Sequence, residues 1–461
     1  MYYKLSPQIL LRGWNGIKYA IYNTKLKNVQ GLSDRQFELL SMCNGIINLE
    51  NIFISKNHRA LINDMVDCGI IYECKYGDQI DDNQFYKYYD NKFIRSAHWS
   101  ITGKCNYKCK HCFMSAPNAK FGEINTADCI KIIDGLYDCG VMQVSLTGGE
   151  PFVRKDFFDI VDYILSKGIH ISQVYTNGSF ITDKLLDEFC KRGIKPEFSL
   201  SFDGVGYHDW MRGIKGAEEK AVRALSLLNK MGFPTSVEMS LNKMNIDSIE
   251  DTVNLLSSLN VSGLKISPTE ESGLWKNEKG KYTLTTEELY KAFLSYIPVY
   301  LNAGSPISIL LGGFFGCEKG SKNYVVPCMK YDGTDAMKCK YICGCSRFNV
   351  YISAGGRLLP CIPMSGFDME STMPDVLEIG FKNAINDNHY SQLTQTTLGE
   401  FLARNDKCNN CEYSLMCGGG CRAEAIITSG DYWGCDKSIC LLFKGGYLKM
   451  IEDAVNSSNS V

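Results

Sequence analysis

The cysteine content of this chain constrains its fold more than any other feature. The 461 residues include 21 cysteines but only six histidines, and twelve of the cysteines lie between Cys317 and Cys440. A scaffold built on disulfides would be short, secreted and even richer in cysteine. Clustered thiols in a reducing compartment more often bind metal. Because histidine is scarce, we expect sites made only of thiolates rather than mixed zinc sites.

Length and charge exclude several other classes of protein. A chain of 461 residues can hold about three domains. Its 49 basic and 51 acidic residues give a net charge of −2, so we expect no nucleic-acid partner and no polybasic membrane patch. The first residues lack the layout of a signal peptide, and no apolar run is long enough to span a bilayer. The sequence therefore predicts a cytoplasmic protein.

Composition divides the chain into five predicted segments. Residues 1–78 form a small α+β module with short strands and two helical stretches. Residues 79–96 are polar and turn-rich, then tyrosine-rich, and are predicted to be a linker. Strands and helices alternate over residues 97–310, whereas glycine and cysteine dominate residues 311–446. The remaining residues, 447–461, are expected to be a frayed tail.

The central segment repeats a strand followed by a helix. Helical stretches at 156–167, 183–192 and 218–231 each stop at a glycine. Six successive βα units predict an α/β fold with a parallel sheet curled into a barrel. The predicted strands are 97–102, 142–147, 171–176, 197–203, 236–241 and 263–267.

Two of these strands are polar on one face only. A closed eight-stranded barrel fills its interior with branched apolar side chains, so a polar face favours an open barrel with a ligand inside. The alternative is a strand half-exposed on both sides. The polar positions are Ser199, Ser201, Asp203, Glu238, Ser240 and Asn242.

Three cysteines directly after the first barrel strand carry the strongest chemical signal. Cys105, Cys109 and Cys112 are spaced Cx3Cx2C. Three thiolates can hold three irons of a [4Fe–4S] cluster and leave the fourth iron open to a substrate or cofactor, whereas ferredoxin clusters use four cysteines. Active sites of βα barrels lie at this end of the strands. The spacing and its position resemble the radical S-adenosylmethionine (SAM) superfamily.

Further motifs on successive strand ends agree with that resemblance. Gly148-Gly149-Glu150-Pro151 resembles the family segment that receives the SAM amino group, and Arg212 resembles the residue that pairs with the SAM carboxylate. Phe113 resembles the residue whose backbone contacts adenine. The resemblance implies that the remaining strand ends line the SAM pocket, through Thr176, Asn177, Ser199, Ser201 and Asp203.

The C-terminal cysteines resemble the SPASM domain, which carries two auxiliary [4Fe–4S] clusters. Its two halves match Cys343-x12-Gly356-x4-Cys361 and Cys408-x2-Cys411-x5-Cys417-x3-Cys421. The resemblance implies that Cys343, Cys361 and Cys421 ligate the first auxiliary cluster. It implies for the second cluster the ligands Cys408, Cys411, Cys417 and a distal cysteine, for which we favour Cys440 over Cys435.

The segment has more thiols than this pattern needs. The fourth ligand of the first auxiliary cluster stays open among Cys317, Cys328, Cys339 and Cys345, and Cys345 could also replace Cys343. Alternatively, that iron is open and binds a substrate thiolate. A pair of zinc ribbons is the competing interpretation of the array.

The N-terminal module resembles the winged-helix-like recognition element, similar to a chaperone of PQQ biosynthesis, that binds leader peptides as an extra strand. Together the resemblances imply a partial (β/α)6 radical SAM barrel flanked by a recognition element and a SPASM domain. They imply a maturase of a ribosomally made precursor peptide, with SAM and three [4Fe–4S] clusters as cofactors. An electron donor such as flavodoxin or ferredoxin would reduce it.

The implied reaction starts with reductive cleavage of SAM to a 5′-deoxyadenosyl radical, which abstracts hydrogen from the peptide. Because thiols are in surplus near the first auxiliary site, we expect a cysteine thioether as the product. Carbon–carbon or cyclophane cross-linking and oxidation to formylglycine are the alternatives. A zinc-stapled winged-helix regulator that binds DNA is the interpretation from a different class.

Overall fold

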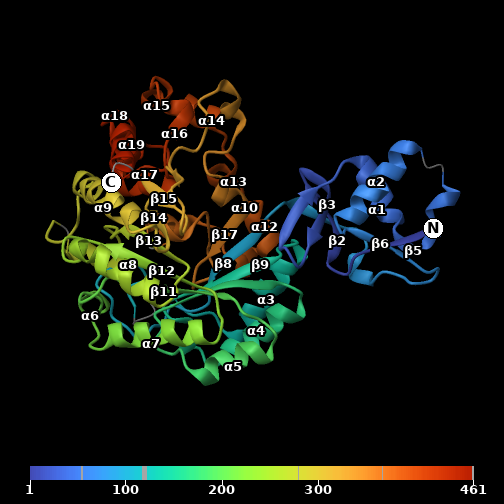
Figure 1. Cartoon of the computed structure of the whole chain (residues 1–461), viewed down its shortest axis with the longest axis horizontal. Helices are drawn as coiled ribbons and strands as arrows, with labels where there is room; N and C mark the ends of the chain where they lie inside the picture. Colours follow the sequence, from blue (N-terminus) through green and yellow to red (C-terminus); the bar gives the residue numbers. More distant parts are fainter. Residues whose placement is uncertain (53–54, 117–121, 279, 366, 459–461) are drawn as a thin grey trace. The chain divides into compact units, whose positions relative to one another are not determined.

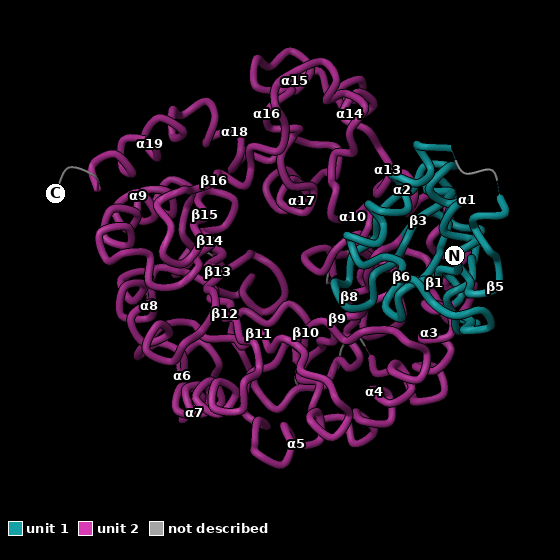
Figure 2. Tube along the Cα trace, turned by 45° about the vertical axis from the view of Figure 1, so that its right-hand side comes forward, with its two compact units in different colours: residues 1–93, 138–140 teal, residues 94–137, 141–461 magenta. Residues whose placement is uncertain are grey.

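The computed structural model describes residues 1–52, 55–116, 122–278, 280–365 and 367–458. The chain divides into two compact units, which Figure 2 colours separately. Unit 1 comprises Met1–Phe93 with Asp138–Gly140, and unit 2 comprises Ile94–Tyr137 with Val141–Val461. Within the described residues, no helix has both the length and the apolar character that a membrane span requires.

Unit 1 holds two small sheets and two helices around one apolar core (Figure 1). Helix α1 begins with a capping box, in which the Ser33 hydroxyl and the Gln36 side chain each accept the other residue's backbone N–H. The three-stranded sheet contains β5 (Asn44–Asn48), β1 (Tyr2–Leu5) and β6 (Ile71–Cys74). The other elements are α1 (Asp34–Met42), α2 (Lys56–Asp67) and the sheet β4 (Asn28–Gly31), β3 (Ile17–Asn23), β2 (Ile9–Asn15), β7 (Lys87–Lys92).

Most of the stretch predicted as a linker, 79–96, instead belongs to unit 1. Strand β7 pairs in parallel with β2, and the unit extends to Phe93. The reason is aromatic packing: Tyr89 is buried and stacks on the buried indole of Trp14 with ring centroids 5.5 Å apart. The turn-forming residues before β7 had suggested a linker, but this strand is part of the sheet of unit 1 and its Tyr89 packs on Trp14.

Unit 2 is built on an eleven-stranded sheet whose parallel part matches the predicted strand order. Each predicted strand overlaps an observed one: β8 (Ser96–Ser100), β9 (Gln143–Thr147), β10 (His170–Thr176), β11 (Glu197–Ser201), β12 (Thr235–Leu241) and β13 (Gly263–Pro268). Strand β14 (Ser308–Leu311) extends the parallel sheet beyond β13, and β17 (Asn349–Ile352) pairs in parallel with β8. The cysteine-rich segment therefore adds a strand directly to the barrel sheet.

The barrel helices lie on the outer side of the curved sheet in unit 2 (Figure 2). Helices α4 (Phe157–Ser166), α5 (Asp183–Lys191) and α7 (Ala217–Lys230) confirm the three predicted stretches. The glycines that follow them, Gly168, Gly193 and Gly232, all have φ of +69°. This left-handed conformation ends a helix at little cost only for glycine. The other helices of this layer are α3 (Thr126–Asp138), α6 (His208–Arg212), α8 (Ile249–Ser258) and α9 (Thr286–Asn302).

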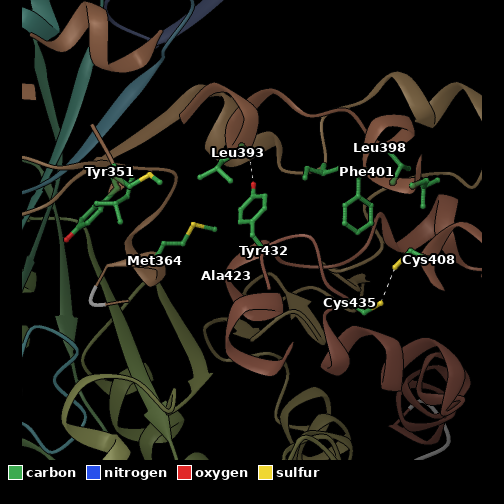
Figure 3. Close-up of a cluster of buried hydrophobic side chains, with 13 residues drawn as sticks. Tyr351, Met364, Leu393, Leu398, Phe401, Cys408, Ala423, Tyr432 and Cys435 are labelled. Carbon is green, nitrogen blue, oxygen red and sulfur yellow. Dashed lines mark hydrogen bonds between the residues drawn. The ribbon is translucent and has the colours of Figure 1, made fainter. Parts of the chain in front are cut away.

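The cysteine-rich segment consists of short elements around a core of its own. Its buried side chains include Tyr351, Leu393, Phe401 and Tyr432, and the Tyr432 hydroxyl donates to the Leu393 carbonyl (Figure 3). A segment dominated by glycine and cysteine thus still contains an apolar core. The elements not yet given are β15 (Phe315–Cys317), β16 (Tyr324–Val325), α10 (Gly344–Phe348), β18 (Leu358–Leu359), α11 (Val376–Ile379), α12 (Phe381–Ile385), α13 (Asn388–Gln395), α14 (Leu398–Arg404), α15 (Asp406–Asn409), α16 (Ser414–Cys417), α17 (Arg422–Ser429) and α18 (Lys437–Lys444).

The expectation of a frayed tail over 447–461 is wrong for the residues that the structure describes. Tyr447–Ser458 form helix α19, and residues 459–461 lie outside the described part. Tyr447, Ile451 and Val455 are buried at intervals of four, which places them on one helix face. The ring of Tyr447 lies 5.0 Å from that of Tyr290 in α9. The polar residues that end the chain favoured a frayed tail in the sequence, although the apolar residues before them share one helix face.

The packing of α19 can be tested with Ile451→Ala. Ile451 has no exposed surface, so its truncation should lower the free energy of unfolding by about 2–4 kcal/mol. Urea denaturation would show this as a lower midpoint. Met450→Ala is the matched control, because Met450 is 45% exposed and should change stability by about 0.5 kcal/mol or less. Equal midpoints for both variants would contradict the described packing.

Candidate active site

The loop after β8 brings the three predicted cluster cysteines to the carboxyl edge of the parallel sheet. Each sulfur has a donor. The Tyr107 N–H lies 3.4 Å from Cys105 Sγ, the Ala116 N–H lies 3.3 Å from Cys112 Sγ, and Arg212 Nη1 lies 3.7 Å from Cys109 Sγ. Donors to sulfur stabilise thiolates and tune a metal bound to them. The three thiols are half-buried, a setting that fits an iron–sulfur cluster.

Burial opposes ionisation of these thiols when no metal is bound. It raises the pKa of Cys105 to about 12 and also raises the pKa of Cys112. Metal ligation requires the thiolate, so binding must release protons. The thiolate form of these cysteines is therefore expected to depend on the bound metal.

Gly148 and Gly149 let the loop after β9 press against the cysteine loop. A Cβ at Gly149 would overlap the Lys104 carbonyl oxygen and come within 3.1 Å of Cys105 Cβ. The Gly149 N–H donates to the Thr102 carbonyl at 2.8 Å, and the Glu150 N–H donates to the Lys104 carbonyl at 2.9 Å. The tight neighbour of both glycines is the protein's own backbone, at the carbonyl oxygens of Thr102 and Lys104.

Glu150 is fully buried behind these glycines and is held by donors from the end of β10. Thr176 Oγ1 donates to its carboxylate at 2.9 Å, and the Asn177 N–H donates at 2.8 Å. Burial nevertheless raises the pKa of Glu150 to about 7. The Phe152 N–H also donates to Glu150 Oε1 at 3.3 Å. A carboxylate offers about four lone-pair positions, so these three donors leave room for one donor from a ligand. Pro151 follows at the start of a short 3-10 turn, Pro151–Val153.

Asn177 ties the end of β10 to the cysteine loop. Its amide nitrogen donates to Asn106 Oδ1 at 2.9 Å and lies 3.9 Å from Cys105 Sγ. Asn106 in turn donates to Ser179 Oγ at 2.9 Å. The cysteine loop is therefore fixed by two side chains that follow β10, which pre-organises its first thiol.

A buried ion pair stands behind Cys109. Arg212 Nε lies 2.7 Å from Asp203 Oδ2, and both side chains are almost completely buried. Burial alone would raise the pKa of Asp203, but Arg212 and neighbouring histidines hold that pKa well below its usual value. Arg212 was predicted to pair with a SAM carboxylate. Its guanidinium in this structure is neutralised by Asp203 and directed to a cluster thiol.

Two histidines beside this pair were missed in the sequence analysis. His208 stacks on Phe202 with ring centroids 5.0 Å apart, and its Nδ1 accepts the Asp203 N–H at 2.9 Å. Burial lowers the pKa of His208 and lowers that of His111 to about 4, so both rings are neutral. Their signal was positional: His111 stands within the cysteine motif, and His208 lies one helical turn before Arg212 in α6.

The remaining predicted SAM residues lie at two places. Phe113 is half-buried under the turn after β13, where the Leu274 N–H donates to the Cys112 carbonyl at 3.2 Å. Ser199 lines a cavity of about 430 Å³ inside the curved sheet, together with the Glu238–Lys265 ion pair. Of the predicted polar inner face, Ser199 and Glu238 line this cavity, whereas Asp203 and Asn242 are fully buried. Ser201 is half-buried on the same strand.

Four thiols predicted for the first auxiliary cluster or as its spare ligand interact with one another. Burial raises the pKa of Cys361 well above its usual value, and the neighbouring thiols of Cys421, Cys343 and Cys345 raise it further. Cys345 is the candidate fourth ligand that lies within electrostatic range of Cys361. Cys317 instead donates to the Ser321 carbonyl at 3.4 Å, and Cys328 lies near Cys417 and Asp436. Cys339 is exposed.

Five thiols surround one small cavity at the predicted second auxiliary site. Cys408, Cys411, Cys417, Cys435 and Cys440 all line it. Cys408 and Cys435 are in contact, with their sulfurs 3.4 Å apart (Figure 3). We favoured Cys440 over Cys435 as the distal ligand from the sequence, and in the structure both thiols line this cavity.

Across the described ranges, no three His, Cys, Asp or Glu side chains converge on a point that would hold a single metal ion. A [4Fe–4S] cluster does not need that convergence, because each thiolate binds a different iron. For an iron–sulfur cluster, the relevant observation is therefore that several thiols lie near one another, not that they point at one metal position.

Comparison with known proteins identifies the barrel. Residues 99–256 match the model of the radical SAM superfamily and form a radical SAM domain, which implies SAM and a [4Fe–4S] cluster as cofactors. The AdoMet-dependent heme synthase of Methanosarcina barkeri is 26% identical over 72% of this chain and 93% of its own length. The antilisterial bacteriocin subtilosin biosynthesis protein AlbA of Bacillus subtilis is 24% identical over 79% of this chain and 74% of its own length.

A solved structure extends the likeness to nearly the whole chain. The crystal structure of Streptococcus suis SuiB bound to precursor peptide SuiA has a TM-score of 0.63 and covers 95% of this chain and 99% of that protein. The identity is 16%, so this likeness concerns the fold.

The buried ion pair can be tested with Asp203→Asn. The amide keeps the shape and the bond from the Ser240 N–H, 3.0 Å long, but leaves the Arg212 charge buried without a partner. Unfolding of the apoprotein should become easier by about 3–5 kcal/mol, measured as a shift in the urea midpoint. Glu238→Gln breaks an ion pair whose side chains are 49% and 44% exposed and should cost about 1 kcal/mol or less. Equal losses would contradict the burial of the Arg212 charge.

Proposed function

Taking residues 99–256 as a radical SAM domain, we propose that the chain is a maturase that cross-links a ribosomally made precursor peptide through a cysteine thioether. The observation that carries this proposal is the cysteine loop. Its three thiols stand at the carboxyl edge of a parallel sheet, each with a donor at its sulfur, beside the buried Glu150 and Arg212. No fourth cysteine is needed if SAM completes the site.

Cys105, Cys109 and Cys112 would hold the cluster that cleaves SAM. The bound cofactors supply the electron and the 5′-deoxyadenosyl radical that removes hydrogen from the peptide. The protein's part is to position SAM. Glu150 has acceptor capacity left for the SAM amino group, and Asn177 borders Cys105. The other SAM contacts proposed are Phe113, Gly148, Gly149, Pro151, Thr176, Ser199, Ser201, Asp203 and Arg212.

Two auxiliary clusters complete the proposed cofactor set. The grouping of Cys343, Cys345, Cys361 and Cys421 supports the first, with Cys345 as its fourth ligand. The cavity lined by Cys408, Cys411, Cys417 and Cys440 supports the second. An external donor such as flavodoxin or ferredoxin would reduce the enzyme.

Unit 1 is proposed to bind the leader of the precursor peptide. Among the described residues, strand β4 pairs with β3 alone and ends its sheet, so its outer edge can accept an added strand through main-chain hydrogen bonds. Its residues are exposed or half-exposed. The likeness to SuiB, which was solved with a precursor peptide, supports this role.

A thioether is favoured over other products because thiols surround the first auxiliary site in surplus. Carbon–carbon or cyclophane cross-linking and formylglycine formation are the alternatives within the same class. Heme synthesis is the second candidate function. It is favoured by the 26% identity to the heme synthase over 93% of that protein's length, an alignment that leaves more than a quarter of this chain unmatched.

The proposal can be tested by co-expressing the full chain with the short reading frames next to its gene. We expect a cysteine-containing peptide to lose two hydrogen atoms in mass and to lose one site for thiol alkylation. The purified protein with SAM and dithionite should release 5′-deoxyadenosine. Cys112→Ala should lower this release about 100-fold or more, whereas Cys190→Ala, an exposed thiol of α5, should not change it.

Each competing function predicts a different result. A loss of mass without loss of an alkylation site would indicate carbon–carbon coupling, and replacement of the thiol by an aldehyde would indicate formylglycine. Release of 5′-deoxyadenosine with every peptide unchanged would contradict a peptide maturase and favour the heme reaction. Absence of that release would contradict the radical mechanism itself.

A further inference from the structure

The second auxiliary site holds one thiol more than a four-iron cluster can bind through protein ligands. Five cysteines line its cavity, whereas a [4Fe–4S] cluster takes at most four thiolates. The fifth thiol is therefore either outside the ligand set or shares a place with another ligand. The positions of the sulfurs distinguish these possibilities.

The side chains of Cys435 and Cys408 are in contact with each other. Their sulfurs are 3.4 Å apart, in van der Waals contact, and both residues are more than nine-tenths buried. They come from separate segments, since Cys408 lies in α15 and Cys435 lies just before α18. Figure 3 shows the two side chains pointing toward each other at the edge of the apolar cluster.

Asn405 holds the two segments at this spacing. Its Oδ1 accepts the Cys408 N–H at 3.0 Å, and its Nδ2 donates to the Trp433 carbonyl at 2.7 Å and lies 3.8 Å from Cys435 Sγ. Arg404 lies over the indole of Trp433 at 4.7 Å. The contact of the two thiols is thus fixed by a bridging amide rather than left to two free side chains.

Cluster geometry makes this contact informative. The four irons of a cube bind four ligands at separate corners, so two sulfurs in contact cannot serve two different irons without moving apart. Cys408 and Cys435 therefore compete for one corner. Cys411, Cys417 and Cys440 are left for the other three corners, so each of them is without a substitute.

We propose that Cys435 is a reserve ligand that can replace Cys408 at the same iron of the second auxiliary cluster; this proposal rests on the presence of that cluster. The exchange needs no oxidant. The Cys435 thiol gives its proton to the departing Cys408 sulfur, one iron–sulfur bond breaks and one forms, and neither charge nor electron count changes. The short distance between the sulfurs allows direct proton transfer.

The test is the iron and acid-labile sulfide content of full-length variants after anaerobic reconstitution. Cys408→Ala and Cys435→Ala should each keep about nine-tenths or more of the parent iron, because either thiol can fill the corner. The double variant and Cys440→Ala each leave three thiolates for the cluster and should lose between about one and four irons per chain, with a three-iron cluster seen by electron paramagnetic resonance where only one iron is lost. Cys190→Ala is the matched control and should match the parent.

A three-iron cluster, or loss of about four irons, in Cys408→Ala alone or in Cys435→Ala alone would overturn the reserve role. Because Cys408 is buried, Cys408→Ser serves as a second variant, and the far-ultraviolet circular dichroism of every variant is compared with that of the parent. Cluster electron paramagnetic resonance should change in Cys408→Ala while iron is kept, which a merely structural thiol would not produce. Equal iron in the parent and Cys411→Ala would show instead that the second cluster itself is absent.

Discussion

The structure depends on how the cysteine loop is clamped to the carboxyl edge of the barrel sheet. Backbone bonds from Gly149 and Glu150 reach the carbonyls of Thr102 and Lys104, at a separation that only glycine permits at position 149. Because the Glu150 carboxylate then accepts from Thr176 and Asn177, three strand ends are joined around one buried acid. The three thiols owe their placement to this arrangement rather than to the loop alone.

Charge compensation follows the same plan. The buried Arg212 is neutralised by Asp203 and also reaches Cys109 in the cysteine loop. Burial alone would raise the pKa of Asp203, but Arg212 keeps this carboxyl group ionised. Neutral His208 fixes the backbone of Asp203 without adding charge. A cofactor bound here would meet an environment whose charges are already paired, which limits reorganisation when an electron arrives.

Much of this could be predicted from the sequence, because regular periodicity and cysteine spacing are local signals. The six strands and the glycine-terminated helices appeared where expected. Long-range contacts were not readable in this way. Strand β7 depends on Tyr89 stacking with Trp14, α19 on a stripe that packs against α9, and Cys435 on a bridge through Asn405. The role of His208 became visible only when helix α6 placed its ring at the Asp203 backbone.

The central claim is that thiols on this chain bind iron–sulfur clusters, and metal analysis tests it most directly. Iron, acid-labile sulfide and zinc would be measured per chain after anaerobic reconstitution of the parent and of the variant with Cys105, Cys109 and Cys112 all changed to Ala. Three clusters predict about twelve irons in the parent and about eight in the variant. Zinc without iron would contradict the account and favour a zinc-stapled protein.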